Sequence, residues 1–416
     1  MASSLQLTLN ARRMQEHIEA LARLTTPEQP YTRRSFTPLY RQGRELVATW
    51  MREAGLEVSM DQAANLMGRR PGSEPGLAAI AIGSHTDTVP GGGRFDGIIG
   101  VVAAIEIARS LDEQGIVLRH PLEVFDYLAE EPSEFGISTV GSRALAGALA
   151  PEHLHLNDPS GRALAQGIAE MGGDPAHFDA ARRAPETFAL SLELHIEQGP
   201  VLEEASLPIG IVTGLVGIQR ASIRLEGIAN HAGTTPMRLR HDALAGAAEI
   251  ILALEHLCRA TEGQAVGTIG KIDSAPNASN VIAGQTDLVA EWRSIDPDLL
   301  ARLTSDFEQQ IRQIADQRGL RLTYNSPSDT EPVQVPSAVQ QLLTQTAEAL
   351  GLRTLALPSG AGHDTNHMAA LAPAGMVFIP SRAGRSHCPE EWSEMEDIAR
   401  GAQVIGQALL AFDRSQ

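Results

Sequence analysis

The sequence predicts an α/β protein of two domains, in which a three-layer domain is interrupted by a smaller βαββαβ domain. Two observations favour this fold class. The chain of 416 residues is longer than a single hydrophobic core usually supports, and strand-like runs alternate with helical ones along its first part. The pattern then changes to the order of a split ferredoxin-like unit. We expect residues 1–214 and 328–416 to form the three-layer domain and residues 215–327 to form the insertion.

The three-layer domain is expected to begin with two helices. Asn10 should cap the first, in which Met14 and Ile18 follow helical spacing, and the second should span residues 38–54 and end at Gly55. Strands are then expected at 56–60, 66–69, 77–84 and 122–128, with a helix at 97–114. Residues 151–185 contain few large apolar side chains, so short helices and loops are expected there.

The insertion is predicted from a second alternation of strands and helices. Strands are expected at 218–225, 267–273, 286–295 and 320–324, and helices at 241–260 and 298–319. This order is βαββαβ. The three-layer domain should then resume with a helix at 336–350, a glycine-rich loop at 359–362, a strand at 375–379 and a final helix.

Composition narrows the classes of partner. The net charge of −18 repels phosphate backbones and anionic membrane surfaces, so neither nucleic acid nor a membrane is expected to bind. The two cysteines, Cys258 and Cys388, lie far apart in sequence, which fits a reducing compartment. The first 25 residues have no apolar core of signal-peptide length, and no stretch approaches the ~20 apolar residues of a membrane span. We expect a soluble, cytoplasmic enzyme.

Histidines and carboxylates gather in short loop and strand-end motifs. A single such residue is more often structural than functional, but this set supplies three imidazoles and two carboxylates from His85, Asp96, Glu131, His195 and His387. Zinc accepts nitrogen and oxygen ligands, and one carboxylate can bridge two ions. The set therefore predicts a site for two divalent metal ions. Zinc is the first expectation, and manganese, cobalt or nickel would accept the same ligands.

Two further carboxylates are expected to act beside the metal ligands. Glu130 and Glu131 close the apolar run 121–129, and neighbouring side chains on an extended backbone point in opposite directions. One carboxylate could thus face a metal while the other, Glu130, serves as the general base. Asp87, two residues after His85, is suited to orient that imidazole. Simple capping of the loop is the alternative for Asp87.

Five motifs resemble those of the amidase, hydantoinase/carbamoylase family of di-zinc hydrolases. They are GSHTDTVPGGGRFDG, ELHIEQGPVLE, HAGTTPM, SGAGHD and SRAGRSHCPEEW. The likeness extends from about Arg33 through Ala411 in the family's motif order. The family lies within the aminoacylase and carboxypeptidase clan and includes N-carbamoyl-L-amino-acid hydrolases, allantoate amidohydrolases and β-ureidopropionases. The resemblance implies a di-metal catalytic domain, an inserted dimerisation or lid domain, and a homodimer.

The resemblance also implies a role for each matching residue. One zinc would be held by His85, Asp96 and His195, and the other by Asp96, Glu131 and His387. Glu130 matches the family's catalytic base. The positions that match substrate-holding residues are Gln198, His231, Asn280, Arg293, Gly362 and His363.

Two of the implied substrate contacts have a clear chemical basis. Arg293 and Asn280 match residues that bind the substrate carboxylate, and a guanidinium can pair with a carboxylate at two points. His231 resembles a histidine that enters the active site of the neighbouring subunit, where it could stabilise an oxyanion. Because isologous pairing would also cover a sheet edge of the insertion, we expect a homodimer with composite active sites.

The chain departs from the family pattern at one place that bears on specificity. Pro132-Ser133-Glu134-Phe135 stands where carbamoylases usually have Gly-Ser-Arg-Phe, which reverses a charge near the base. Cys388 stands where the family commonly has serine, and this difference is expected to have no effect on function.

The predicted activity is metal-dependent hydrolysis of the C–N bond in a small ureido or amide compound that bears a carboxylate. An N-carbamoyl-L-amino acid is the first expectation for the substrate. Allantoate, β-ureidopropionate and N-acyl amino acids or peptides are alternatives, and a catalytically inactive binding module is a remote one. An intact Glu130 argues against the last, because a binding role needs no base.

Overall fold

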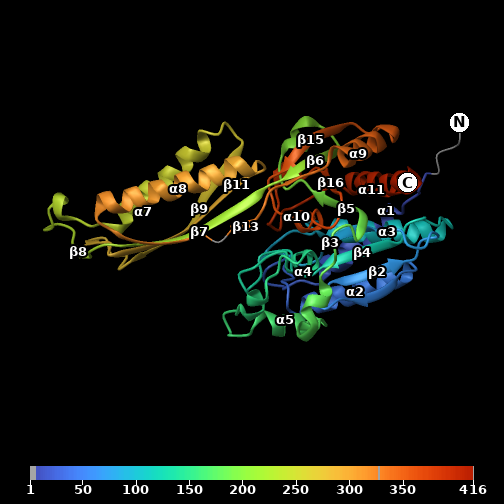
Figure 1. Cartoon of the computed structure of the whole chain (residues 1–416), viewed down its shortest axis with the longest axis horizontal. Coiled ribbons are helices and arrows are strands. Elements are labelled where there is room, and N and C mark those ends of the chain that lie inside the picture. Colours follow the sequence, from blue (N-terminus) through green and yellow to red (C-terminus); the bar gives the residue numbers. More distant parts are fainter. Residues whose placement is uncertain (1–5, 327, 416) are drawn as a thin grey trace. The chain divides into compact units, whose positions relative to one another are not determined.

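The computed structural model describes residues 6–326 and 328–415, which form two compact units of mixed α/β structure (Figure 1). The larger unit runs to Thr213 and also contains Val335–Leu357 and the chain from His363 onward. The smaller unit comprises Gly214–Gln334 and Pro358–Gly362. Among the described residues, no helix has the length and apolar character needed to cross a bilayer.

The larger unit contains the helices and strands expected in its first part. Asn10 caps the first helix by accepting a hydrogen bond of 3.1 Å from the backbone N–H of Arg13. The helices are α1 (Ala11–Arg23), α2 (Pro38–Glu53), α3 (Ile98–Glu113), α4 (Val140–Ala146), α5 (Leu164–Glu170), α6 (Val201–Ala205), α9 (Ser337–Ala349), α10 (Thr365–Met368) and α11 (Met395–Ser415). Residues 151–185 form α5 and the short 3₁₀ helices Pro151–His155 and Pro175–Ala181, as predicted.

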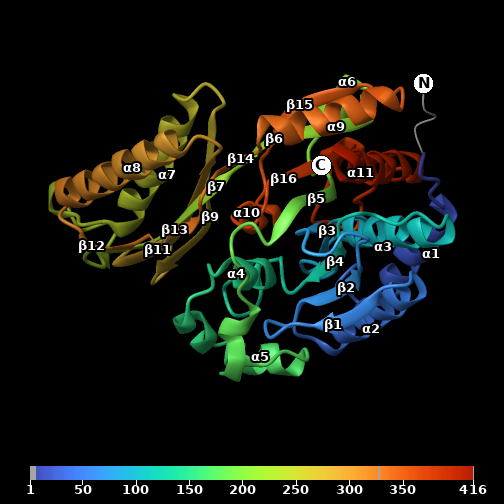
Figure 2. The same cartoon turned by 45° about the vertical axis from the view of Figure 1, so that its right-hand side comes forward.

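A central sheet divides the larger unit into three layers. Its strands are β1 (Glu57–Met60), β2 (Leu66–Arg70), β3 (Ala79–His85), β4 (Leu122–Tyr127), β5 (Phe188–Ile196), β6 (Ile209–Leu215), β15 (Thr354–Ser359) and β16 (Ala374–Ile379). They pair in the order β1-β2-β4-β3-β5-β16-β6, with β15 beside β6 (Figure 2). Strands β4, β3, β5 and β16 are mutually parallel. Parallel strands are buried on both faces, which explains why every residue of β3 and of β16 is buried.

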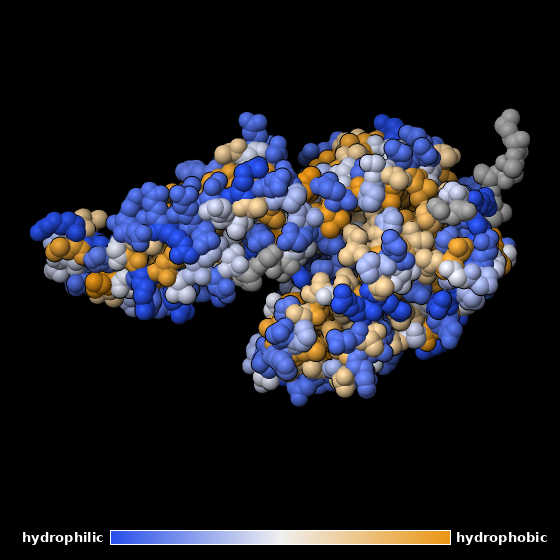
Figure 3. Space-filling model, viewed as in Figure 1, coloured by the Kyte–Doolittle hydropathy of each residue, from blue (hydrophilic) through white to orange (hydrophobic). Residues whose placement is uncertain are grey.

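The smaller unit has the predicted βαββαβ order. Its main strands and helices are β7 (Gly217–Glu226), α7 (Ala243–Arg259), β9 (Ala265–Ala275), β11 (Gln285–Ser294), α8 (Pro297–Arg318) and β12 (Arg321–Asn325). The antiparallel sheet has the order β12-β7-β11-β9. The two helices bury one face of the sheet around Trp292 and Phe307. On the face drawn in Figure 3, the surface over α7 and α8 is mainly hydrophilic.

Short strands complete the smaller unit. β8 (Asn230–His231) pairs with β10 (Val281–Ile282), and β13 (Ser328–Thr330) pairs with β7. β14 (Val333–Gln334) pairs with residues 214–215 of β6. Both β13 and β14 lie within the smaller unit, which includes the chain as far as Gln334. The sequence pattern did not predict these short elements, nor β15, α4 and α10; strands of two or three residues and the four-residue α10 are too short to display a period.

Candidate metal centre

The carboxyl ends of four adjacent parallel strands bring the predicted metal ligands together. His85 is the last residue of β3, and His195 is the last residue but one of β5. Glu131 lies in the turn after β4, and His387 lies in the loop after β16. Open α/β sheets bind their ligands at this edge, where loops from neighbouring strands meet.

The ligand atoms form two groups that share one carboxylate. Those of His85, Asp96 and His195 all lie within 4.8 Å of one another, and so do those of Asp96, Glu131 and His387. Asp96 Oδ1 lies 3.6 Å from His85 Nε2 and 3.2 Å from His195 Nε2. The other oxygen, Oδ2, lies 3.2 Å from His387 Nε2. A carboxylate that presents one oxygen to each group has the arrangement of a bridging ligand for two ions.

The imidazole tautomers suit this arrangement. His85 Nδ1 lies 3.2 Å from the carbonyl oxygen of Asp87, and His195 Nδ1 lies 2.9 Å from the carbonyl oxygen of Ile196. A carbonyl only accepts, so both Nδ1 atoms carry hydrogen, and in the neutral form of each ring the lone pair is on Nε2, the atom that faces the cluster. His85 Nε2 is buried and has no hydrogen-bond partner among the described residues. The donors present therefore fit divalent cations.

The electrostatics of the cluster point the same way. Burial would lower the pKa of His85, but the charges of Glu130, Asp87 and Asp96 raise it well above its ordinary value. Hydrogen bonds to Asp96 and Glu131 raise the pKa of His387 to about 11. Burial would raise the pKa of Asp96, yet His195, His387 and His85 hold it well below its usual range. Without metal, these carboxylates hold protons on the imidazoles, and a cation would displace those protons.

Glycine is required where the loop after β3 passes under the cluster. Gly97 has φ of +66°, and a Cβ at this position would overlap the ring of His85. Gln198 and His387 also have positive φ, at 59° and 56°. Such values are uncommon for residues other than glycine and cluster at functional sites.

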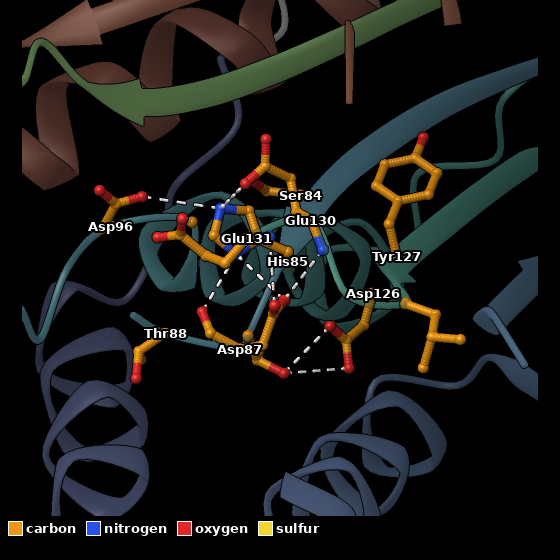
Figure 4. A network of polar contacts seen from close by, with 12 residues as sticks. Ser84, His85, Asp87, Thr88, Asp96, Asp126, Tyr127, Glu130 and Glu131 are labelled. Carbon is orange, nitrogen blue, oxygen red and sulfur yellow. Dashed lines mark hydrogen bonds and ion pairs between the residues drawn. The ribbon is translucent and has the colours of Figure 1, made fainter. Parts of the chain in front are cut away.

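Glu130 and Glu131 are held by Asp87 rather than by a strand. β4 ends at Tyr127, and Ala129 has φ of 50°, so the two glutamates lie in the loop after the strand rather than on the strand itself. Instead, Asp87 accepts the backbone N–H of Glu130 at Oδ1 and that of Glu131 at Oδ2, both at 3.2 Å (Figure 4). Asp87 thus orients His85 and also positions both glutamates.

Glu130 lies beside the first group without belonging to either. Its Oε2 is 3.6 Å from His85 Nε2, and the residue is 8% exposed. Burial, reinforced by the charge of Glu131, raises the pKa of Glu130 well above its ordinary value despite the opposing charge of His85. A carboxylate in this position can exchange a proton with a reactant held at the cluster.

Two of the expected substrate residues lie beside the cluster. The side-chain amide of Gln198 donates to Asp96 Oδ2 at 2.6 Å and lies 3.3 Å from His387 Nε2. The ring of His363 packs edge-on against His195 with 4.5 Å between centroids. Glu193, His195 and His363 form a third group of candidate ligands. Its carboxylate accepts hydrogen bonds from Ser84 and Thr365, so it already has protein partners.

The remaining expected residues lie in the smaller unit. His231 on β8 lies next to Asn280, whose carbonyl accepts the backbone N–H of Ala232 at 3.0 Å. Arg293 on β11 donates from Nη1 to the carbonyl of Gly360 at 2.8 Å, two residues before Gly362. Its Nε and Nη2 donate to Glu291 at 2.8 Å and 2.6 Å.

The negative charge of Glu134, which stands where the family usually has arginine, is paired with a cation. Its carboxylate accepts a hydrogen bond of 2.8 Å from Arg34, whose side chain is only 15% exposed. The glutamate therefore has a cationic partner within the larger unit, which the sequence pattern had not indicated.

Ser386 and Glu391 were not predicted as site residues, although both lie in the quoted motif SRAGRSHCPEEW. Glu391 is 1% exposed and accepts the backbone N–H groups of Phe95 and Asp96 at 2.8 Å and 3.1 Å. The hydroxyl of Ser386 contacts Asp96 Oδ2 at 2.9 Å. The only signal in the sequence was the adjacent pair Glu390-Glu391, which resembles Glu130-Glu131.

Comparisons with known proteins identify the family to which the chain belongs. Residues 81–411 match the sequence profile of peptidase family M20/M25/M40. An N-carbamoyl-L-amino acid amidohydrolase from Geobacillus stearothermophilus is 42% identical over 379 residues, which cover 91% of this chain and 92% of that protein. An allantoate deiminase from Arabidopsis thaliana is 33% identical over 401 residues, covering 89% and 76% of the two chains. An amidase of the hydantoinase/carbamoylase family from Burkholderia multivorans superposes with a TM-score of 0.86 at 33% identity, covering 98% of each chain.

Proposed function

Because the chain belongs to peptidase family M20/M25/M40, we propose that it is a metal-dependent amidohydrolase that converts an N-carbamoyl-L-amino acid to the amino acid, carbon dioxide and ammonia. The observation that supports this most directly is the pair of ligand groups that share Asp96, with Glu130 beside them but outside both. A peptide-bond specificity is not favoured, because the similar relatives named above act on carbamoyl and ureido compounds.

The metal centre would hold two divalent ions, with zinc as the first candidate. Ions held there would act as Lewis acids toward the scissile carbonyl and would favour ionisation of the attacking water. Three buried carboxylates, those of Asp96, Glu130 and Glu131, surround the positions where the ions would bind. Two divalent cations would offset the charge of these three carboxylates, which lowers the repulsion of an anionic substrate.

Glu130 would transfer the proton. Its carboxylate accepts a proton from the attacking water and returns it to the leaving nitrogen. Asp87 accepts the backbone N–H of Glu130, which fixes the backbone from which the base projects. Gln198 and His363 would contact the bound substrate from the larger unit.

His231 is prepared to donate a hydrogen bond to an oxyanion. Its Nδ1 accepts the backbone N–H groups of Gly233 and Thr234 at 3.0 Å and 3.2 Å. The neutral ring must therefore carry its proton on Nε2, and the residue is exposed. A fixed N–H donor of this kind stabilises the negative charge that develops on a carbonyl oxygen. Asn280 lies beside it and, together with Arg293, would bind the substrate carboxylate.

Each active site would be completed by a second copy of the chain. The edge strand β9 pairs only with β11 among the described strands, and its Val266 and Ile272 are 59% and 46% exposed. Pairing of two copies would cover this edge and place His231 of one chain in the site of the other. Mixing inactive His231→Ala with inactive Glu130→Gln should restore part of the activity, because one site of each heterodimer then has both residues. If subunit exchange is demonstrated by mass spectrometry and no activity returns, His231 does not act in the other chain's site.

A substrate panel tests the proposed activity. Metal-loaded protein is offered N-carbamoyl amino acids, ureidopropionate, allantoate, N-acyl amino acids and dipeptides. Release of ammonia with the free amino acid from the carbamoyl compounds supports the proposal. Release of an amine without ammonia would identify an N-acyl hydrolase or peptidase, and faster turnover of allantoate or ureidopropionate would identify those substrates. If protein loaded with metal converts none of these compounds, the remaining interpretation is a catalytically inactive binding module.

The enzyme is proposed to work in the cytoplasm. Both cysteines are free, and Cys258 is buried, as expected for a reducing compartment. Fractionation of cells that express the chain would test this, and recovery in a secreted fraction would contradict it.

A further inference from the structure

Two loops that contain metal ligands are joined through a buried glutamate that belongs to neither ligand group. The first loop follows β3 and ends in Asp96, and the second follows β16 and contains His387. Glu391 lies four residues after His387 and is 1% exposed. We propose that Glu391 is a positioning residue, which fixes Asp96 and the His387 loop so that the shared carboxylate can serve two ions. This inference rests on the proposed two-metal function.

Both oxygens of Glu391 are used for this contact. Oε1 accepts the backbone N–H of Phe95 at 2.8 Å and that of Asp96 at 3.1 Å. Oε2 lies 2.8 Å from the hydroxyl of Ser386. These bonds hold the peptide on which the bridging ligand sits, across a sequence separation of 295 residues between Asp96 and Glu391.

Ser386 extends the contact to the ligand itself. Its hydroxyl also lies 2.9 Å from Asp96 Oδ2, the oxygen that faces His387, and its single proton can be donated to Glu391 or to Asp96. Ser386 directly precedes His387 in the chain, so one dipeptide contacts Asp96 twice. The orientation of the Asp96 carboxylate is therefore determined by the second loop as well as by its own.

Aromatic contacts join the same two loops outside the polar contact. Phe95 packs edge-on against Trp392 with 5.5 Å between ring centroids, and the guanidinium of Arg94 lies 4.5 Å from the centroid of Trp392. The two loops are thus joined by the hydrogen bonds to Glu391 and also by these aromatic contacts. A contact of this kind keeps the metal ligands in place before any ion binds, which lowers the cost of ordering them.

Gly93 offers an independent way to disturb the contact. A Cβ at this position would overlap the carboxylate of Glu391, although the backbone of Gly93 does not have a positive φ. Gly93→Ala should therefore displace the Glu391 carboxylate without removing it and without straining the backbone.

The test measures metal affinity rather than activity. Metal-free protein is titrated with Zn²⁺ against a competing chromophoric chelator. Loss of a residue that holds a metal ligand typically weakens metal binding roughly 10–100-fold, and we expect this for Glu391→Ala. Glu391→Gln should bind within a few-fold of the wild type, because its amide oxygen can still accept both N–H groups. Glu390→Ala is the matched control, since the neighbouring Glu390 has a side chain that is 63% exposed and only a 3.9 Å ion pair with Arg385.

The outcomes separate this inference from the proposed function. Wild-type protein that binds no Zn²⁺ would reject the two-metal function itself. Wild-type protein that binds two ions, with a folded Glu391→Ala variant of equal affinity, would reject the positioning role. A merely structural role would lower the melting temperature of the metal-free variant and leave the affinity of the folded protein unchanged. If Glu391→Ala does not fold, the Zn²⁺ affinity of Gly93→Ala tests the proposal instead. Wild-type affinity in Gly93→Ala would overturn it.

Discussion

Replacing Glu130 by glutamine separates the proposed catalytic base from the metal ligands. The two side chains have nearly the same shape, and the residue is 8% exposed, so little repacking is expected. The hydrogen bond to Asp87 uses the backbone N–H of Glu130 and would persist in the variant. The variant loses the negative charge of the carboxylate and, with it, the ability to take up a proton beside the metal centre.

The expected effect on turnover is large. General acid–base catalysis contributes about 10²–10⁴-fold to a rate, which corresponds to about 3–5 kcal/mol of activation free energy. We expect Glu130→Gln to lose that factor in kcat. Three neighbouring carboxylates are already engaged, because Asp96 and Glu131 belong to the ligand groups and Asp87 accepts two backbone N–H groups.

Metal content distinguishes this role from ligation. Glu130→Gln should retain the wild-type number of ions per chain, since Glu130 belongs to neither ligand group. Glu131→Gln is the matched control and should lose affinity at one site, because Glu131 Oε1 lies 3.3 Å from His387 Nε2. The assay combines elemental analysis with ammonia release from an N-carbamoyl amino acid. A Glu130→Gln variant that keeps both its metal and the wild-type kcat would refute the assignment.

Three further predictions address the metal, the substrate and the fold. Dialysis against a chelator should abolish turnover, and reactivation should saturate at two divalent ions per chain; full activity with one ion would reject the two-metal mechanism. Arg293→Lys should reduce turnover of carboxylate-bearing substrates at least 10-fold and that of their amides little, because lysine lacks the two-pronged donor; equal losses would indicate a structural role. Burial lowers the pKa of His367 from 6.5 to about 3, so the metal-free protein should lose stability as pH falls below 6.5, by about 2 kcal/mol at pH 5. Urea unfolding should show a weaker pH dependence in His367→Gln, and an unchanged one would exclude His367 as the cause.

Local patterns were sufficient to predict most of the fold. Helical spacing, capping by Asn10 and the stop at Gly55 each depend on neighbouring residues, and the structure has α1 and α2 where these signals placed them. The βαββαβ order of the smaller unit was likewise readable from the change of period along the chain. The backbone geometry after β4 could not be predicted in this way. Ala129 has a positive φ that alanine does not prefer locally, and the chain beyond it is held by hydrogen bonds from two N–H groups to the distant Asp87.

The sequence by itself determined which chemical groups are available: three imidazoles and several carboxylates in motifs that resemble those of one hydrolase family. Which of them lie together was decided by the order of strands in the sheet, because β4, β3, β5 and β16 lie side by side although the ligands at or after their ends are far apart along the chain. The same order brings the carboxylate of Glu391 to the backbone of Asp96. It also brings Asp87 to the backbone N–H groups of Glu130 and Glu131. Such contacts depend on hydrogen bonds between residues far apart along the chain, for which no local spacing exists in the sequence.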